Sequence, residues 1–201
     1  MYITKIEKGK GRRYRVYSDE QLVFALYDKQ LRYYNIEENR ELKDDTIDAI
    51  LKDIILKCAK ERALYLLERK MYTVSMMRDK LICNDYPESV VEQVLSFLKK
   101  YRYLDDKAYV CMYIRNYSSK KSRKQLMLDL HIKGIEKQLV NDFFEEYEYS
   151  EEQCFARQFE RYVRGKDLTN FSDRNKVFRY FYGKGFSTNL INEYMRNFSE
   201  V

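Results

Sequence analysis

The stretch YPESVV at Tyr86–Val91 is the first of three related segments, followed by IEKQLV at Ile135–Val140 and FSTNLI at Phe186–Ile191. Their starts lie 49 and then 51 residues apart. From each start, apolar residues recur at five matching positions with the spacing of one helix face. The aligned sets are Val90, Leu139 and Leu190; Val91, Val140 and Ile191; Val94, Phe143 and Tyr194; Leu95, Phe144 and Met195; and Leu98, Tyr147 and Phe198. This period indicates a repeated helical unit.

The helix before each of these segments repeats as well. The aligned residues are Thr73, Ser122 and Asp173 as N-cap types, Leu81, Leu130 and Phe181 at the helix end, and Gly134 and Gly185 in the following turn. Ser122 with Gln125 forms a capping-box pattern, and glycine favours the left-handed residue that ends a helix. Each unit is therefore predicted to hold three helices. The first helix of each unit is expected at Thr46–Lys70 in unit one, Asp105–Asn116 in unit two and Glu151–Arg164 in unit three.

The N-terminal region has a different pattern. Tyr2–Glu7 and Arg13–Tyr17 flank Gly9-Lys10-Gly11, which predicts a β-hairpin, and Leu22–Tyr27 predicts a third strand. A sheet this small is barely stable alone, so we expect it to pack against helices that begin near Asp28 and resume near Thr46.

The predicted fold is thus mainly α: three tandem three-helix repeats in an elongated, curved array, preceded by a small β-rich region. The expected boundaries are 1–45 for the N-terminal extension with its short helix, 46–104 for repeat one, 105–150 for repeat two and 151–201 for repeat three.

Composition restricts the class of protein. The 201 residues are 45% hydrophobic and 35% charged, with a single proline, which excludes disordered and collagen-like chains. The first ten residues carry charge where a signal peptide needs an apolar core, and no apolar run reaches the roughly 20 residues of a membrane span. We therefore expect a cytoplasmic protein without membrane contact.

The four cysteines, Cys58, Cys83, Cys111 and Cys154, form no CxxC pair. This spacing predicts packed, reduced thiols rather than a zinc site or a disulfide framework. We expect neither a metal nor a cofactor.

Charge is distributed in blocks of alternating sign. Met1–Val16 has a net charge of +5 and Tyr117–Gln138 of +4, within a total of +6. Asn141–Glu152 contains six acidic and no basic residues, whereas Arg157–Gly185 contains eight basic and three acidic ones. These blocks indicate a patterned surface with basic faces for an anionic partner.

Enzyme chemistry finds little support in the sequence. The single histidine, His131, stands at an apolar helix end without a cysteine or carboxylate arrangement around it, which favours a structural role. Adjacent residues on a helix point in different directions, so Asp105-Asp106 fits a helix N-terminus better than a metal site. The phosphate-binding and nucleophile motifs GxxxxGK[ST], GxGxxG and GxSxG are absent from the sequence.

Segments between Ala63 and Ile135 resemble the RecX family of regulatory proteins. They are ALYLLERKMYT (Ala63–Thr73) followed by MRDKL (Met77–Leu81); YLDD (Tyr103–Asp106) with Tyr109 and YIRN (Tyr113–Asn116); and SRKQL (Ser122–Leu126) with LHIKGI (Leu130–Ile135). The order and spacing of these segments carry the resemblance. It implies a non-enzymatic protein that binds the RecA recombinase. We expect the protein itself to be a monomer. Family members lie along the groove of the RecA–DNA filament and restrain ATP hydrolysis, strand exchange and coprotease activity, in DNA repair, recombination and the SOS response.

Basic clusters are the candidate contacts to a filament or to phosphates. The main candidates are Lys120, Lys121, Arg123, Lys124, Arg115, Arg161, Arg164, Lys166, Arg174, Lys176 and Arg179; weaker candidates are Arg69, Lys70, Arg78, Lys80, Arg12 and Arg13. Cations at the start of the helix after Ser122 oppose the helix dipole, which favours a functional role over a merely solvated terminus. In repeat three the basic residues alternate with aromatic ones, a pattern that suits nucleic acid, although Phe178 and Phe181 fit the helix core.

Three hypotheses remain open at this point. The first is regulation of a recombinase filament, with the RecA filament and single- or double-stranded DNA as partners. The second is direct DNA binding by a tandem helical module without recombinase contact, which predicts a steep salt dependence. The third is an adaptor scaffold without nucleic acid, for which reversing the charges of Lys120, Lys121, Arg123 and Lys124 would have no effect.

Overall fold

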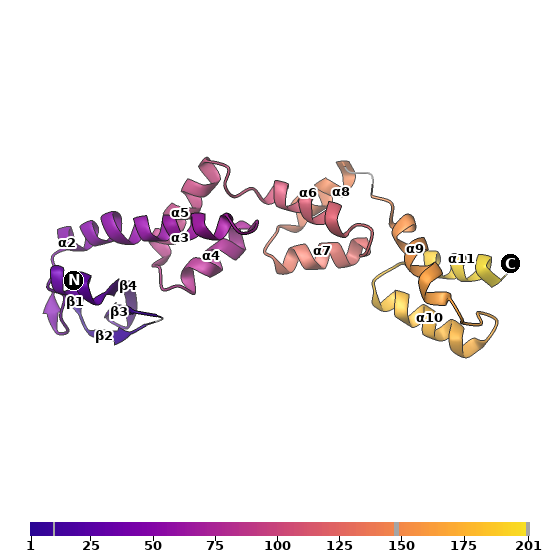
Figure 1. The fold of residues 1–201 in the computed structure, drawn as a ribbon, viewed down its shortest axis with the longest axis horizontal. Coiled ribbons are helices and arrows are strands. Elements are labelled where there is room, and N and C mark those ends of the chain that lie inside the picture. The colour runs from indigo at the N-terminus through magenta and orange to yellow at the C-terminus, as the bar shows by residue number, and fades with distance from the viewer. Residues whose placement is uncertain (10, 147–148, 200–201) are drawn as a thin grey trace. The chain divides into compact units, whose positions relative to one another are not determined.

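The chain is mainly helical, with a small β region at its N-terminus, as predicted (Figure 1). The structure is a computed structural model that describes residues 1–9, 11–146 and 149–199. It contains two compact units, Met1–Asp105 and Asp106–Val201. Among the helices of the described ranges, none has both the length and the apolar character that crossing a bilayer requires. The elongated arrangement and the four domain boundaries stay predictions.

The N-terminal sheet confirms the predicted three strands. Strands β2 (Lys5–Lys8), β3 (Arg13–Ser18) and β4 (Gln21–Tyr27) pair antiparallel in that order. The prediction of one continuous strand over Tyr2–Glu7 is wrong, because Thr4 separates β1 (Tyr2–Ile3) from β2 and the two strands belong to different sheets. The carbonyl of Ile3 accepts a hydrogen bond from the Asn39 amide, and β1 pairs with β5 (Arg40–Glu41).

Three helical segments follow one another without a break in the first unit. They are α2 (Asp44–Ala49), the π-helical segment η1 (Ile50–Ile55) and α3 (Leu56–Leu67). Together they replace the predicted helix Thr46–Lys70, with ends shifted by two and three residues. The short helix α1 (Asp28–Tyr33) precedes them, and α4 (Val74–Ile82) and α5 (Glu88–Lys100) complete the unit. The Thr73 hydroxyl accepts a hydrogen bond from the Met76 amide, which confirms this residue as an N-cap.

One hydrophobic core joins the sheet to these helices. Val16 and Phe24 from the sheet are fully buried in the same cluster as Ile50, Val90 and Leu98. All five apolar positions of the first aligned segment are buried in α5. The expectation that the sheet packs against the helices is therefore confirmed.

A charged contact fixes the sheet to the turn between α4 and α5. Asp85 adopts a positive φ of 61° and is buried, and its Oδ1 lies 2.8 Å from Nη2 of Arg15 on β3. Arg13 Nη2 donates a hydrogen bond of 2.6 Å to the carbonyl of Asn84, and its guanidinium lies 5.1 Å from the centre of the Tyr86 ring. Arg13 and Arg15 thus connect β3 to a turn some 70 positions later in the chain.

The second unit contains two groups of three helices. They are α6 (Asp106–Tyr117), α7 (Arg123–Ile132) and α8 (Lys137–Glu146), then α9 (Glu151–Val163), α10 (Phe171–Gly183) and α11 (Thr188–Ser199). The capping box of Ser122 and Gln125 is confirmed, with Ser122 Oγ accepting from the Gln125 amide at 3.2 Å. Gly134 and Gly185 both have positive φ, 77° and 84°, as the turn requires.

Two details of repeat three differ from the prediction. The N-cap of α10 is Asn170 rather than Asp173, because the helix starts earlier and the Asn170 side chain accepts from the Ser172 amide. Asp173 instead forms an ion pair with Lys176. Phe198 remains 48% exposed, since it lies on the last turn of α11 and reaches Phe159 only edge-on. Its counterpart Tyr147 lies outside the described residues, as does Lys10 of the hairpin loop.

Aromatic rings form the core of repeat three. Phe155, Phe159, Phe181 and Phe186 are buried together, and Phe178 is half-buried against them, as expected for the core face of α10. The cysteines are free thiols. The expectation that all four are packed is wrong for Cys83, which is exposed in the turn after α4.

Gly185 offers a test of the turn between α10 and α11. A Cβ there would lie 3.1 Å from Cβ of Lys124 and 3.2 Å from Oγ of Ser122, whereas a Cβ at Gly165, also with positive φ, would meet nothing within 4 Å. We expect Gly165→Ala to lower the free energy of unfolding by about 1 kcal/mol through backbone strain, and Gly185→Ala by at least about twice as much. Urea unfolding followed by circular dichroism measures both. Equal losses would contradict the close packing of this turn.

Candidate polyanion interface

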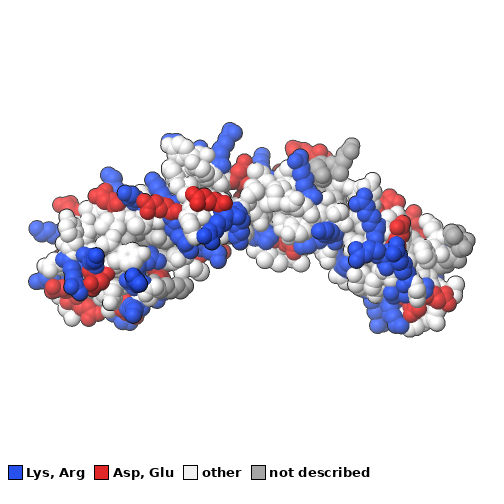
Figure 2. Space-filling model, viewed as in Figure 1, with Lys and Arg blue, Asp and Glu red and all other residues white. Residues whose placement is uncertain are grey.

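A groove in the second unit gathers basic residues that are distant in the sequence. It lies between the α6–α7 turn and helices α9 and α10 and has a volume of about 600 Å³. We call it the basic groove; its lining residues are Ser119, Lys120, Arg157, Gln158, Arg161, Tyr162, Tyr180 and Lys184. Figure 2 shows Lys and Arg side chains gathered over α9 and α10.

The basic groove contains four cations whose side chains are free of ion pairs in the part of the chain that the structure describes. Within the described ranges, Lys120, Arg157, Arg161 and Lys184 form no ion pair, and the first three are exposed. Nζ of Lys184 donates a hydrogen bond of 2.8 Å to Oε1 of Gln158, a neutral acceptor. Four cations side by side create a positive potential that attracts an anionic polymer.

Two tyrosines in the basic groove stack on each other. The rings of Tyr162 and Tyr180 lie 3.8 Å apart and are nearly parallel, at 4°. Nζ of Lys166 lies 4.1 Å from the centre of the Tyr162 ring, and Nζ of Lys184 lies 4.6 Å from that of Tyr180. Because nothing fits between rings this close, each ammonium covers an outer face. These rings therefore offer no free face to a nucleic-acid base, and the groove suits phosphates instead.

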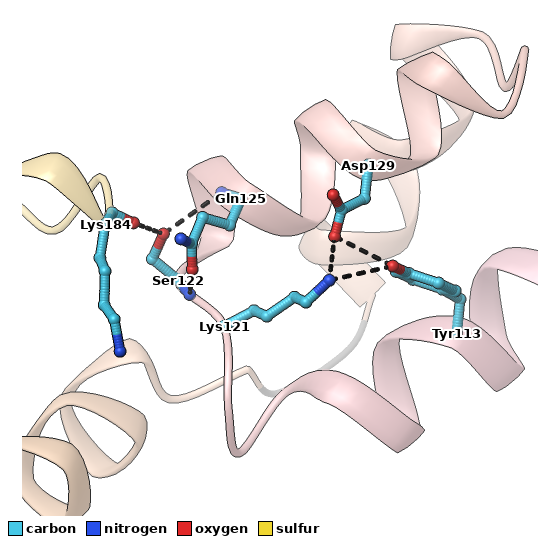
Figure 3. A network of polar contacts seen from close by, with 6 residues as sticks. All are labelled: Tyr113, Lys121, Ser122, Gln125, Asp129 and Lys184. Carbon is cyan, nitrogen blue, oxygen red and sulfur yellow. Dashed lines mark hydrogen bonds and ion pairs between the residues drawn. The ribbon is translucent and has the colours of Figure 1, made fainter.

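The α6–α7 turn that carries Lys120 is held by a polar network (Figure 3). Nζ of Lys121 forms an ion pair with Asp129 and donates to the Tyr113 hydroxyl at 3.2 Å; that hydroxyl donates to Oδ2 of Asp129 at 2.9 Å. Partial burial opposes ionisation of Asp129, but the hydrogen bonds from Lys121 and Tyr113 outweigh it and lower the pKa of this carboxyl. The network fixes the turn from one side.

The same turn is hydrogen-bonded to the α10–α11 connection and to Tyr149, which precedes α9. Ser122 Oγ donates to the carbonyl of Lys184 at 2.6 Å, as Figure 3 shows, and the carbonyl of Lys121 accepts from the Tyr149 hydroxyl at 2.8 Å. Ser122 is fully buried, so these hydrogen bonds are shielded from water. They bring Lys120 and Lys184 together as lining residues of one groove.

Comparison with known proteins finds relatives that match nearly the whole chain. A family model described as RecX, first three-helix domain, matches residues 59–98. The regulatory protein RecX of Clostridium acetobutylicum is 28% identical over 209 residues, which cover 98% of this chain and 97% of that protein. A crystal structure described as regulatory protein RecX is 26% identical, with a TM-score of 0.62 and 98% of each chain covered. Over nearly its whole length, the chain is thus similar to regulatory proteins of the RecX family.

Two further RecX proteins support parts of this comparison. The regulatory protein RecX of Streptococcus mutans is 32% identical over 152 residues, 75% of this chain and 58% of that protein. The crystal structure of RecX from Lactobacillus salivarius is 20% identical, with a TM-score of 0.65, and covers 73% of this chain and 98% of that one. The latter supports the fold.

The structure places the basic candidates of the second unit in different surroundings. Lys120 and Arg161 line the basic groove, and Lys166 lies beside it on Tyr162. Lys121 belongs to the polar network, and Lys176 pairs with Asp173. The remaining candidates are exposed outside the basic groove: Arg115, Arg123, Lys124, Arg164, Arg174 and Arg179.

Sequence reasoning missed two residues of the basic groove, Arg157 and Lys184. Arg157 precedes Arg161 by four positions on α9, so the two share a helix face, a spacing visible in the sequence. Lys184 stands next to Gly185, where the local pattern predicts only a helix-ending turn. Its proximity to Lys120 depends on the hydrogen bond from Ser122, 62 positions earlier, which no local pattern reveals.

The weaker candidates lie in the first unit, where most of their side chains contact residues close to them in the sequence. The guanidinium of Arg69 lies 4.4 Å from the Tyr65 ring centre, and Nζ of Lys70 lies 4.7 Å from that of Tyr72. Arg78 forms ion pairs with Glu92 and, at 3.9 Å, with Glu88. Arg13 contacts the α4–α5 turn, whereas Lys80 and Arg12 are exposed.

Groups that would indicate catalysis are not assembled in the part of the chain that the structure describes. No three His, Cys, Asp or Glu side chains there could hold a metal ion together. Asp106 lies in the first turn of α6, as expected for a helix N-terminus. His131 is exposed on α7, and the buried Cys154 has a pKa raised by desolvation, which keeps its thiol protonated.

The polar network predicts a pH-dependent contribution to stability. Because the folded-state pKa of Asp129 lies below its ordinary value of 3.8, its stabilisation is present above about pH 4 and is lost as the pH falls through the folded-state value. We expect Asp129→Asn to lower the free energy of unfolding by about 1 kcal/mol at pH 7 and by much less at pH 3. Urea unfolding at both pH values measures this, with Asp48→Asn, an exposed aspartate of α2, as the control. A loss of equal size at both pH values would count against the network.

Proposed function

We propose that this protein binds the filament that the RecA recombinase forms on DNA and lowers its ATPase, strand-exchange and coprotease activities. The observation that carries the proposal is the basic groove, which four cations without ion pairs line. The similarity of the chain to RecX proteins supports the choice of partner. A polyanionic filament presents regularly spaced phosphates and acidic side chains that such a groove attracts. The protein acts by binding rather than by catalysis.

The chemistry of the groove favours contacts that do not depend on base sequence. Its tyrosine faces are covered by Lys166 and Lys184, so recognition relies on charge and on the spacing of anionic groups. A regulator with this property is able to act on a filament assembled on any sequence.

A second candidate function is direct binding to DNA without the recombinase. The exposed guanidinium groups of Arg157 and Arg161, four positions apart on α9, favour it, because they match an anionic backbone by themselves. The two functions differ in whether DNA alone is bound as tightly as the filament.

The first test measures the DNA-dependent ATPase and strand exchange of purified RecA with increasing amounts of this protein. We expect inhibition at micromolar protein, and we expect Lys120→Glu to need about tenfold more protein for the same effect, or about 1.4 kcal/mol of binding free energy. Lys107→Glu, an exposed lysine of α6 outside the basic groove, is the matched control. Unchanged recombinase activity at micromolar wild-type protein would refute the proposed function.

The second test separates the two candidate functions by salt dependence. Single-stranded DNA with and without RecA is titrated with the wild type and with a variant carrying Arg157→Gln and Arg161→Gln. For a phosphate contact at each arginine, the slope of log affinity against log salt decreases by about 0.7 per contact. Equal affinity for bare DNA and for the filament would favour the DNA-binding module, whereas much tighter filament binding supports the regulator.

A further inference from the structure

A second groove of the Asp106–Val201 unit has an apolar floor. It lies between α7 and α8 and has a volume of about 550 Å³. Met127 and Leu128 of α7 and Ile135 and Val140 of the following turn and helix form its floor and walls. We call it the α7–α8 groove; it has no lining residue in common with the basic groove.

Leu128 makes this groove available to a partner. The core face of α7 is formed by Leu126 and Leu130, which are fully buried, whereas Leu128 is 58% exposed. Ile135 and Val140 are buried beneath it, so the exposed leucine continues an apolar surface that reaches into the core. An apolar hollow on the surface of a small helical protein marks an interaction site more often than a single exposed leucine does.

The rim of the α7–α8 groove is positively charged. Arg123, Lys124 and Lys137 stand around the apolar floor, against one carboxylate, that of Glu151. Oε1 of Glu151 accepts a hydrogen bond of 2.9 Å from the Arg123 amide, and the Arg123 guanidinium lies 4.8 Å from the centre of the Phe144 ring. In the described ranges, no side-chain ion pair neutralises Lys124 or Lys137.

We propose that the α7–α8 groove binds an acidic amphipathic segment of a partner protein. The apolar anchors of that segment fill the hollow beside Leu128, and its carboxylates contact Arg123, Lys124 and Lys137. An apolar floor with a cationic rim is the complement of a helix with apolar residues at i and i+4 and acidic residues around them. A nucleic-acid strand has phosphates for the rim but fills the floor poorly.

This inference goes beyond the proposed function, because it assigns protein recognition to a surface separate from the basic groove. It also accounts for Arg123 and Lys124, which the structure places away from Lys120. The hydrogen bond between Ser122 and Lys184 lies between the two grooves, so one short basic stretch serves both.

The test uses the full chain and three fluorescein-labelled helical peptides. The first consists of glutamate and alanine with leucines at i and i+4; the second replaces the leucines with alanine, and the third replaces the glutamates with lysine. Fluorescence anisotropy measures their affinities. We expect the first peptide to bind at least about tenfold more tightly than either of the others.

Variants of α7 and α8 locate the binding to the groove. Leu128→Glu and Lys137→Glu should each weaken binding of the first peptide by about tenfold. Ile132→Glu is the matched control for the leucine, since Ile132 is 74% exposed on the same helix but does not line the groove; Lys107→Glu is the control for the lysine. Circular dichroism checks that every variant is folded, as expected for exposed positions.

Three outcomes would overturn the proposal. In the first, the glutamate–leucine peptide binds no better than the alanine or lysine peptide. In the second, Ile132→Glu weakens binding as much as Leu128→Glu does. In the third, sedimentation shows that the wild-type chain associates with itself and that Leu128→Glu abolishes this, which would assign the groove to a second copy. None of these measurements contains recombinase or DNA, so their outcome is independent of the proposed function.

Discussion

A left-handed residue between the second and third helix of each repeat constrains the whole structure. Asp85, Gly134 and Gly185 occupy this position, with φ between 61° and 84°. The turn ends one helix and starts the next within a few residues, which lets two apolar faces meet in a small core. The residues that contact this turn differ between repeats: Arg15 pairs with Asp85, whereas Ser122 and Lys124 lie against the turn at Gly185.

In the second unit, the turn at Gly185 joins the α10–α11 connection to the start of α7. The Ser122 hydroxyl, which caps α7, also donates to the carbonyl of Lys184, and the absence of a side chain at Gly185 makes room for this approach. The basic stretch around Ser122 is thereby divided. Lys120 faces the basic groove, Lys121 braces the turn through Asp129, and Lys124 borders the α7–α8 groove.

The sequence predicted what depends on local periodicity. The helix faces, the caps at Thr73 and Ser122 and the glycine turns follow from spacing and from the chemistry of single residues, so they could be found without coordinates. The pairing of β1 with β5, the contact of Arg15 with Asp85 and the position of Lys184 join residues distant in the chain. The basic groove was therefore predicted only in part: Lys120 and Arg161 were candidates, whereas their assembly with Arg157 and Lys184 required the fold.

The aromatic residues of repeat three also show that a local sequence pattern does not reveal which residues meet in the fold. Alternation of basic and aromatic residues in repeat three suggested faces open to bases. Tyr162 and Tyr180 instead cover each other, and their outer faces hold lysines. The pattern indicates a basic region, but the mode of contact that it could support depends on which rings pair in space.

Asp85 has a consequence for how the first unit is built. A non-glycine residue with positive φ costs about 1 kcal/mol, and burial of its carboxylate adds to this unless a cation is nearby. That cation is Arg15, which comes from the β-sheet. A truncated chain without the strands would keep the strained turn but lose its compensating charge. We therefore expect the first three helices and the sheet before them to unfold cooperatively, with the sheet as an integral part of the first unit rather than a removable appendage.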